Sequence, residues 1–282
     1  LALRRGWSRL LAPIRRAYDV LGPIDPAVAR ATGLDPATPV LTGIHDSNAN
    51  YLRYLAQPTR DWTLLSTGTW LITFNPAGSV DALEAARDTC TNTDVFGQPV
   101  PCSRFMIGRE FERVAGPEGM AAAATPADVT AVIGKGAMAL PSFTDMGGPV
   151  PGSSGSGRLI GADDLAAGER RALALLYVAL MTDLALDAVG AADRLIVDGP
   201  LAQEPLFGPL LAAVRQASVE LDRCRRHDRR RRTARQPRRA GACPGPGSQA
   251  CSAPSATGPR HLRAGLDRCR PLRGKLWVGA EP

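Results

Sequence analysis

The sequence predicts an α/β fold, because short apolar runs bounded by Gly and Pro alternate with longer segments that have helical periodicity. The strand-like runs occupy 39–42, 62–66, 70–74 and 194–198, and the helical segments occupy 47–57, 169–189 and 204–216. Hydrophobic residues make up 44% of the 282 residues, which is enough to bury a core in one large domain or two small ones.

The first strand leads into a helix through a glycine turn. Pro39-Val-Leu-Thr predicts a buried strand, and the turn that leaves it runs from Gly43 to Asp46. We expect Asp46 to be the N-cap of helix 47–57, so that its carboxylate is fixed and points out of the sheet edge. Taken alone, Asp46 is only an N-cap, and His45 is a structural hydrogen-bonding residue.

A tight β-hairpin is expected next, with strands 62–66 and 70–74 on either side of a glycine turn. Small hydroxyl residues around a Gly let the backbone approach an anion, and the amides and hydroxyls of Ser66, Thr67, Gly68 and Thr69 could hold phosphate groups. By itself, Ser-Thr-Gly-Thr more often closes an ordinary hairpin.

The second half of the body is a long helix, a strand and a further helix. Apolar residues on all sides of helix 169–189 predict that it is largely buried. Strand 194–198 ends in Asp198-Gly199-Pro200, which on its own is simply a turn. Helix 204–216 follows that turn.

Gly43-Ile-His-Asp46 and, about twenty residues later, Ser66-Thr-Gly-Thr69 resemble the two core motifs of FGGY-family carbohydrate kinases. The pair His45-Asp46 and the turn Asp198-Gly-Pro are similar to the rhamnulokinase and fuculokinase branch. The resemblance implies the C-terminal lobe of an actin-like, ribonuclease-H-like ATPase fold.

The resemblance also implies an activity, which is ATP-dependent phosphorylation of a ketose such as a rhamnulose-like or fuculose-like deoxy sugar. It makes Asp46 the catalytic base that accepts the proton of the sugar hydroxyl, and it places His45 against the sugar. Ser66, Thr67, Gly68 and Thr69 would contact the ATP phosphates, and Gly199 would lie near the adenine. Mg²⁺ would bridge the phosphates, with no metal ligand assigned to this chain.

The resemblance covers roughly residues 6–216, and we predict a partial C-terminal kinase domain over 1–221. The family's N-terminal lobe, with its Asp-x-Gly-Thr or Asp-x-Gly-Ser phosphate motif, is expected to be missing from these 282 residues. Turnover by the chain alone should therefore be impaired, since positioning from both sides supplies most of the rate in phosphoryl transfer.

Residues 222–282 differ in composition, with sixteen basic and four acidic side chains and almost only small, Pro, Gln, Cys or Arg residues over 237–259. This composition predicts a disordered tail. One hypothesis is a frameshift in a GC-rich gene, because a shifted frame of 221–233 permits the family's Asp-Gly-Thr segment. The alternatives are an arginine-rich nucleic-acid-binding module and an inactive pseudogene product.

The remaining signals favour a cytoplasmic enzyme. The longest apolar run, 172–181, is too short to span a bilayer, which takes about 20 residues, and no secretory segment is visible. The expected partners are a small sugar and ATP, with no membrane and only non-specific nucleic-acid contact through the tail. The oligomeric state stays open.

Overall fold

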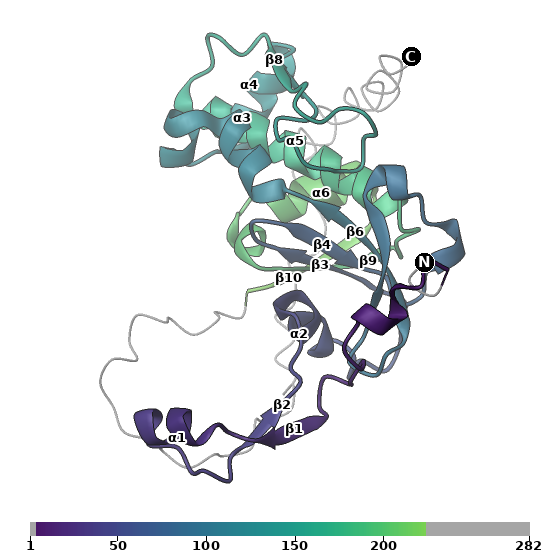
Figure 1. The fold of residues 1–282 in the computed structure, drawn as a ribbon. Coiled ribbons are helices and arrows are strands. Elements are labelled where there is room, and N and C mark those ends of the chain that lie inside the picture. Colours follow the sequence, from purple (N-terminus) through teal and green to yellow (C-terminus); the bar gives the residue numbers. More distant parts are fainter. Residues whose placement is uncertain (1–3, 224–282) are drawn as a thin grey trace.

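The computed structural model describes residues 4–223, so the predicted tail, 222–282, lies outside the described residues except for Asp222 and Arg223. A six-stranded sheet in the order β10-β9-β3-β4-β6-β5 forms the centre (Figure 1). Its strands are β3 (Thr63–Thr67), β4 (Leu71–Phe74), β5 (Thr89–Thr93), β6 (Pro99–Phe105), β9 (Arg194–Asp198) and β10 (Ser218–Asp222). The α/β prediction is confirmed.

Parallel and antiparallel pairs divide this sheet into two halves. Strands β10, β9 and β3 run parallel, whereas β4, β6 and β5 continue from β3 in antiparallel steps. In the parallel half, Ser66 is in register with Asp198, and Asp198 is in register with Asp222. The carboxyl ends of three strands, and the start of the β3–β4 turn, therefore meet at one edge of the sheet.

One face of the sheet is covered by helices α3 (Ile107–Ala121), α5 (Ala167–Asp187) and α6 (Phe207–Arg215), with α4 (Pro126–Gly134) packed against α5 (Figure 1). Leu65, Leu195 and Val197 of the strands belong to this core. Helix α5 is buried along most of its length, as its apolar residues on all sides predict.

Helix α2 (Asp46–Leu52) lies on the opposite face. Tyr51 and Tyr54 pack there with Trp62, Leu64 and the other residues of a second, smaller core. The Tyr51 ring stacks on that of Phe74, with the ring centroids 4.7 Å apart. Because Leu64 and Leu65 are adjacent in one strand, they serve opposite cores, as the alternation of a strand requires.

The segment before α2 extends away from this body over residues 20–41 (Figure 1). It contains η1 (Trp7–Leu10), β1 (Val20–Pro23), α1 (Pro26–Thr32) and β2 (Pro39–Leu41). The predicted strand at 39–42 is present, but all three residues of β2 are exposed, so the expectation of burial is wrong. Strand β2 pairs with β1 in a separate two-stranded sheet, and such a sheet has no core of its own.

Short elements complete the chain. They are η2 (Val80–Ala82), η3 (Ala85–Arg87), the pair β7 (Met138–Leu140) and β8 (Arg158–Ile160), and η4 (Pro200–Gln203). Within the described residues, no helix is both long enough and apolar enough to cross a bilayer.

Candidate functional site

The first turn of α2 presents His45 and Asp46. His45, not Asp46, is the N-cap: its Nδ1 accepts a hydrogen bond from the Ser47 amide at 3.3 Å, and Asp46 is the first helical residue. The predicted cap is therefore wrong by one position. An imidazole nitrogen replaces the short carboxylate that is preferred at such positions, so the Asp46 side chain is not used in capping.

Asp46 projects from the fold, with 86% of its side chain exposed. Its Oδ1 accepts from the Ser47 hydroxyl at 3.3 Å and lies 3.1 Å from His45 Nδ1. One ring nitrogen cannot both accept from the Ser47 amide and donate to Asp46, so the two contacts are alternatives. Asp46 thus lies open beside an imidazole.

The β3–β4 hairpin forms as predicted, and its tip is exposed at Gly68 and Thr69. The start of α3 supports the tip from behind: the Gly108 amide donates to the Thr69 carbonyl at 3.1 Å. A Cβ on Gly108 would lie 2.9 Å from the Gly68 carbonyl oxygen, which is closer than packed atoms approach. Gly108, at the start of α3, therefore holds the hairpin in place.

Thr67 faces inward, unlike the tip. Its hydroxyl donates to the Asp198 carbonyl at 2.7 Å and accepts from the Leu201 amide at 3.2 Å. These bonds fasten β3 to the turn after β9, where Gly199 has a φ of +99°. The Thr67 side chain is therefore committed to the fold, and Gly68 and Thr69 are the residues offered to solvent.

A cleft of about 1330 Å³ joins the two motifs, since His45 and Asp46 line it together with Ser66 to Thr69. Arg15, Arg16 and Arg104 also line it, together with the carboxylates of Asp19, Asp46 and Asp94. The structure thus brings together site residues that the sequence placed in separate segments.

A second cavity of about 740 Å³ lies on the other side of the hairpin tip. Gly68 and Thr69 contribute to both cavities, and Pro200, Leu201 and Glu204 contribute to the second. Gly199 itself is not among the lining residues of either cavity, but the residues that follow it are. The hairpin tip therefore separates a cleft that contains Asp46 from a cavity beside the β9 turn.

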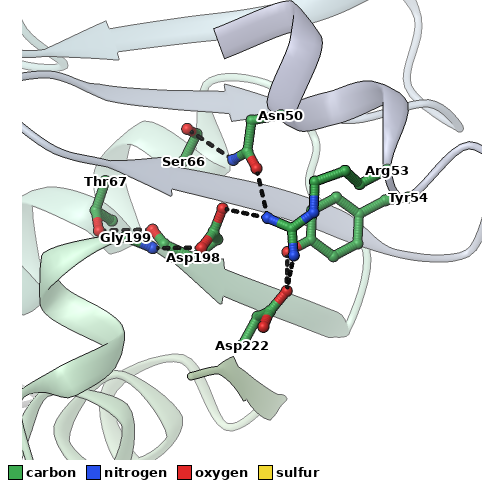
Figure 2. A network of polar contacts seen from close by, with 8 residues as sticks. All are labelled: Asn50, Arg53, Tyr54, Ser66, Thr67, Asp198, Gly199 and Asp222. Carbon is green, nitrogen blue, oxygen red and sulfur yellow. Dashed lines mark hydrogen bonds and ion pairs between the residues drawn. The ribbon is translucent and has the colours of Figure 1, made fainter. Parts of the chain in front are cut away.

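A polar network that sequence analysis missed connects α2 to the sheet edge (Figure 2). Asn50 Nδ2 donates to Ser66 Oγ at 3.0 Å, and Arg53 lies 3.3 Å from an Asp198 oxygen and 2.8 Å from an Asp222 oxygen. The only local signal for this network is that Asn50 and Arg53 are polar residues three apart on a helix with an apolar face. Their partners are distant in sequence.

The exposed tip of the hairpin leaves room for a phosphate group. The exposed Gly68 has room around it, because a Cβ there would meet only the Trp70 carbonyl, at 3.9 Å. Between residues 4 and 223, no group of three or more His, Cys, Asp or Glu side chains is arranged to hold a metal. Mg²⁺ usually binds through one or two carboxylates together with substrate phosphates, so it would reach this site with the nucleotide.

Comparison with known proteins identifies related sugar kinases. The FGGY carbohydrate kinase C-terminal domain matches residues 59–234. A solved carbohydrate kinase from Novosphingobium aromaticivorans is 39% identical, with a TM-score of 0.60, over 77% of this chain and 50% of that one. No match was found among curated proteins.

More distant structures share the fold. A gluconate kinase from Lactobacillus acidophilus is 15% identical, with a TM-score of 0.55, over 74% of this chain and 44% of that one. A xylulose kinase from Rhodospirillum rubrum is 21% identical, with a TM-score of 0.51, over 74% of this chain and 44% of that one. The chain spans about half the length of the structures that it matches, and the predicted actin-like, C-terminal-lobe fold is confirmed.

Proposed function

The chain belongs to the FGGY carbohydrate kinase family, and from this membership we propose that it supplies half of a site for ATP-dependent phosphorylation of a sugar. The observation that carries the proposal is that Asp46 and the hairpin tip at Gly68 line one cleft. Phosphoryl transfer needs a group that orients the acceptor hydroxyl and donors that stabilise the phosphoryl oxygens. These two requirements match the two motifs.

Asp46 is the proposed catalytic base. As the sugar hydroxyl oxygen attacks the γ-phosphorus, its O–H bond breaks and the proton passes to a carboxylate oxygen of Asp46. The bond between the γ-phosphorus and the bridging oxygen breaks, and ADP leaves with that electron pair. The openness of Asp46 gives a sugar access to the carboxylate.

The hairpin is the proposed phosphate contact, through the backbone of Gly68 and Thr69 and the hydroxyls of Thr69 and Ser66. Thr67 supports this contact indirectly, because its hydroxyl fixes the hairpin to the turn after β9. Magnesium bound to the phosphates would neutralise part of their charge. The cavity beside Pro200 and Leu201 would receive the nucleoside, and the adenine would then lie near Gly199.

The sugar is proposed to be a ketose of the rhamnulose or fuculose type. The support is the adjacent pair His45-Asp46, which places an imidazole beside the base at the mouth of the cleft. An imidazole there can donate to or accept from a sugar hydroxyl.

A fusion protein tests the function. Residues 6–222 would replace the half of the Novosphingobium aromaticivorans carbohydrate kinase that matches this chain, and ADP release would be followed with a panel of ketoses, aldoses and sugar acids. We expect ketose-dependent ADP release of about 1 s⁻¹ or faster. A folded fusion that binds Mg·ATP but releases no more ADP with any sugar than without one would contradict the proposal.

A further inference from the structure

Three residues lie in one row across the parallel half of the sheet. Ser66 of β3 is in register with Asp198 of β9, which is in register with Asp222 of β10. The row runs along the carboxyl edge of the sheet, next to the hairpin tip. Two carboxylates side by side in neighbouring strands repel each other, so the row needs a cation.

Helix α2 and the two residues that follow it span this row and contact every member of it (Figure 2). Asn50 donates to Ser66 at 3.0 Å, and Arg53 donates to Asp198 at 3.3 Å and to Asp222 at 2.8 Å. Arg53 also donates to Asn50 Oδ1 at 3.0 Å, which joins the two side chains into one chain of contacts. Tyr54 adds a hydrogen bond to Asp222 at 2.5 Å.

The burial of the partners makes these contacts matter for stability. The Asp198 side chain is 3% exposed and that of Asp222 is 21% exposed, whereas Arg53 is 42% exposed. A buried carboxylate that loses its cation costs far more than a broken surface ion pair. The Arg53 guanidinium therefore has a restricted position, and α2 moves only if these bonds break.

The same helix carries Asp46 at its other end. The Asp46 side chain itself contacts the Ser47 hydroxyl and the exposed His45 ring, and two residues further on Asn48 donates to Asn92 Oδ1 at 2.9 Å and to the Thr93 carbonyl at 2.6 Å. The position of the carboxylate relative to the hairpin is thus set by how α2 is fixed at Asn48 and further along, at Asn50 and Arg53.

We propose that Asn50 and Arg53 are positioning residues that lock the helix bearing Asp46 to the phosphate hairpin, and this inference rests on the proposed function. Asn50 acts on the hairpin itself through Ser66. Arg53 joins the helix to β9 and β10 and neutralises Asp198 and Asp222, which would otherwise place two negative charges beside the phosphates.

The 282-residue chain allows a direct test by nuclear magnetic resonance. With Mn·ATP as the probe, the paramagnetic ion should broaden the amide signals of Gly68 and Thr69 at the hairpin, and of Asp46 and Ser47 on α2. In Arg53→Ala the hairpin signals should still broaden, while broadening at Asp46 and Ser47 should fall at least severalfold, because it depends steeply on distance. Arg53→Lys, which keeps a charge but can hold fewer oxygens, should give an intermediate value.

Arg194→Ala is the matched control. Arg194 also links these strands, through Glu220 of β10 at 2.7 Å and Gln57 beyond α2 at 2.9 Å, but at the far end of β9. The Arg194→Ala variant should leave the broadening of the Asp46 amide signal unchanged. Broadening at Asp46 that is the same in Arg53→Ala as in the unaltered chain, or equally reduced by Arg194→Ala, would overturn the inference.

Amide hydrogen exchange without ligand separates this inference from the proposed function. Exchange over residues 46–52 should speed up by about tenfold or more in Arg53→Ala, as the loss of charge-assisted hydrogen bonds implies, and should speed up less in the milder Asn50→Ala. Exchange in α5 should not change. If Mn·ATP failed to broaden Gly68 both in the unaltered chain and in the fusion protein, the proposed function would fall, while unchanged exchange over 46–52 would overturn the positioning role.

Discussion

Gly199 and Thr67 approach each other so closely that a Cβ on residue 199 would lie 1.9 Å from the Thr67 carbonyl oxygen. The φ of Gly199 is also +99°, a backbone conformation that residues with a side chain rarely adopt. The contact lets β9 end against the base of the hairpin, where the Thr67 hydroxyl bonds to the Asp198 carbonyl. Glycine is required there by packing, before any nucleotide binds.

Gly199→Ala should therefore destabilise the fold by about 2 kcal/mol or more, since it adds a steric clash to backbone strain. Gly97→Ala is the control, because Gly97 has a φ of +83° but no atom within 4 Å of its added Cβ. Strain alone should cost it about 1 kcal/mol. Urea unfolding measures both, and equal losses in the two variants would refute the packing argument.

Glu110 is a fully buried carboxylate that anchors a distant loop. It accepts from the amides of Phe143 and Thr144, at 3.0 and 2.9 Å, and from the hydroxyls of Thr144 and Tyr177, at 2.7 and 2.6 Å. Glu110→Gln keeps the shape but turns one acceptor into a donor that faces other donors. We expect a loss of about 2–4 kcal/mol in the free energy of unfolding.

The exposed neighbour Glu112 supplies the control for that variant. Glu112→Gln should change the free energy of unfolding by no more than about 0.5 kcal/mol. Thermal or urea unfolding of the pair gives the comparison, and a Glu110→Gln protein as stable as Glu112→Gln would show that the buried carboxylate is dispensable.

The buried phenol of Tyr51 should make the free energy of unfolding depend on pH in the alkaline range. Burial, the main cause, raises the pKa of Tyr51 from 10.0 to about 12. Below pH 10 the phenol is protonated whether the chain is folded or unfolded. Between pH 10 and 12 the unfolded chain releases the proton and the folded chain keeps it, so the free energy of unfolding falls as pH rises.

Tyr51→Phe removes this contribution, so its free energy of unfolding should fall less steeply than that of the unaltered protein over the same range. Burial also raises the pKa values of Tyr54 and Tyr177, so part of the fall should persist. Urea unfolding at a series of pH values from 9 to 11.5 measures the slope. Identical slopes for the two proteins would contradict the assignment to Tyr51.

Thr67 and Thr69 are two residues apart in the same motif and should behave differently. Thr67→Val removes a buried hydroxyl with two partners and should cost about 1–3 kcal/mol of stability. Thr69→Val alters an exposed position, so stability should hold while Mg·ATP binding weakens by about 1.5–3 kcal/mol, the value of a hydrogen bond to a charged group. Calorimetric titration with Mg·ATP and urea unfolding of both variants test this prediction. It is contradicted if Thr67→Val weakens Mg·ATP binding without loss of stability and Thr69→Val destabilises the fold.

Local sequence patterns were enough to predict some of the elements that form the cores, but not α3, α4 or β6, which also contribute to them. The β3–β4 hairpin, α5, β9 and α6 follow from alternation, from helical spacing and from the glycine turns between them. Burial could not be predicted in the same way. Pro39-Val-Leu-Thr has the composition of a core strand, but β2 has only β1 as a partner among the described residues, and it stays exposed.

The candidate site was predicted where it consists of motifs and missed where it consists of long-range contacts. His45, Asp46 and the hairpin came from the sequence, and the structure brings them to one cleft. Arg53 meets Asp198, 145 positions further along the chain, only because β9 lies next to β3, and no local pattern specifies that strand pairing. The N-cap assignment failed for a smaller reason, since a histidine nitrogen took the place of the aspartate.

Asp46→Asn in the fusion protein tests the central claim most directly. The amide keeps the shape of the carboxylate but cannot accept the proton, so kcat for ketose-dependent ADP release should fall by about 10² to 10⁴-fold while KM for the ketose changes little. Asp35→Asn, an exposed position away from the cleft, should leave kcat unchanged. An Asp46→Asn fusion with the kcat of its parent would contradict the account.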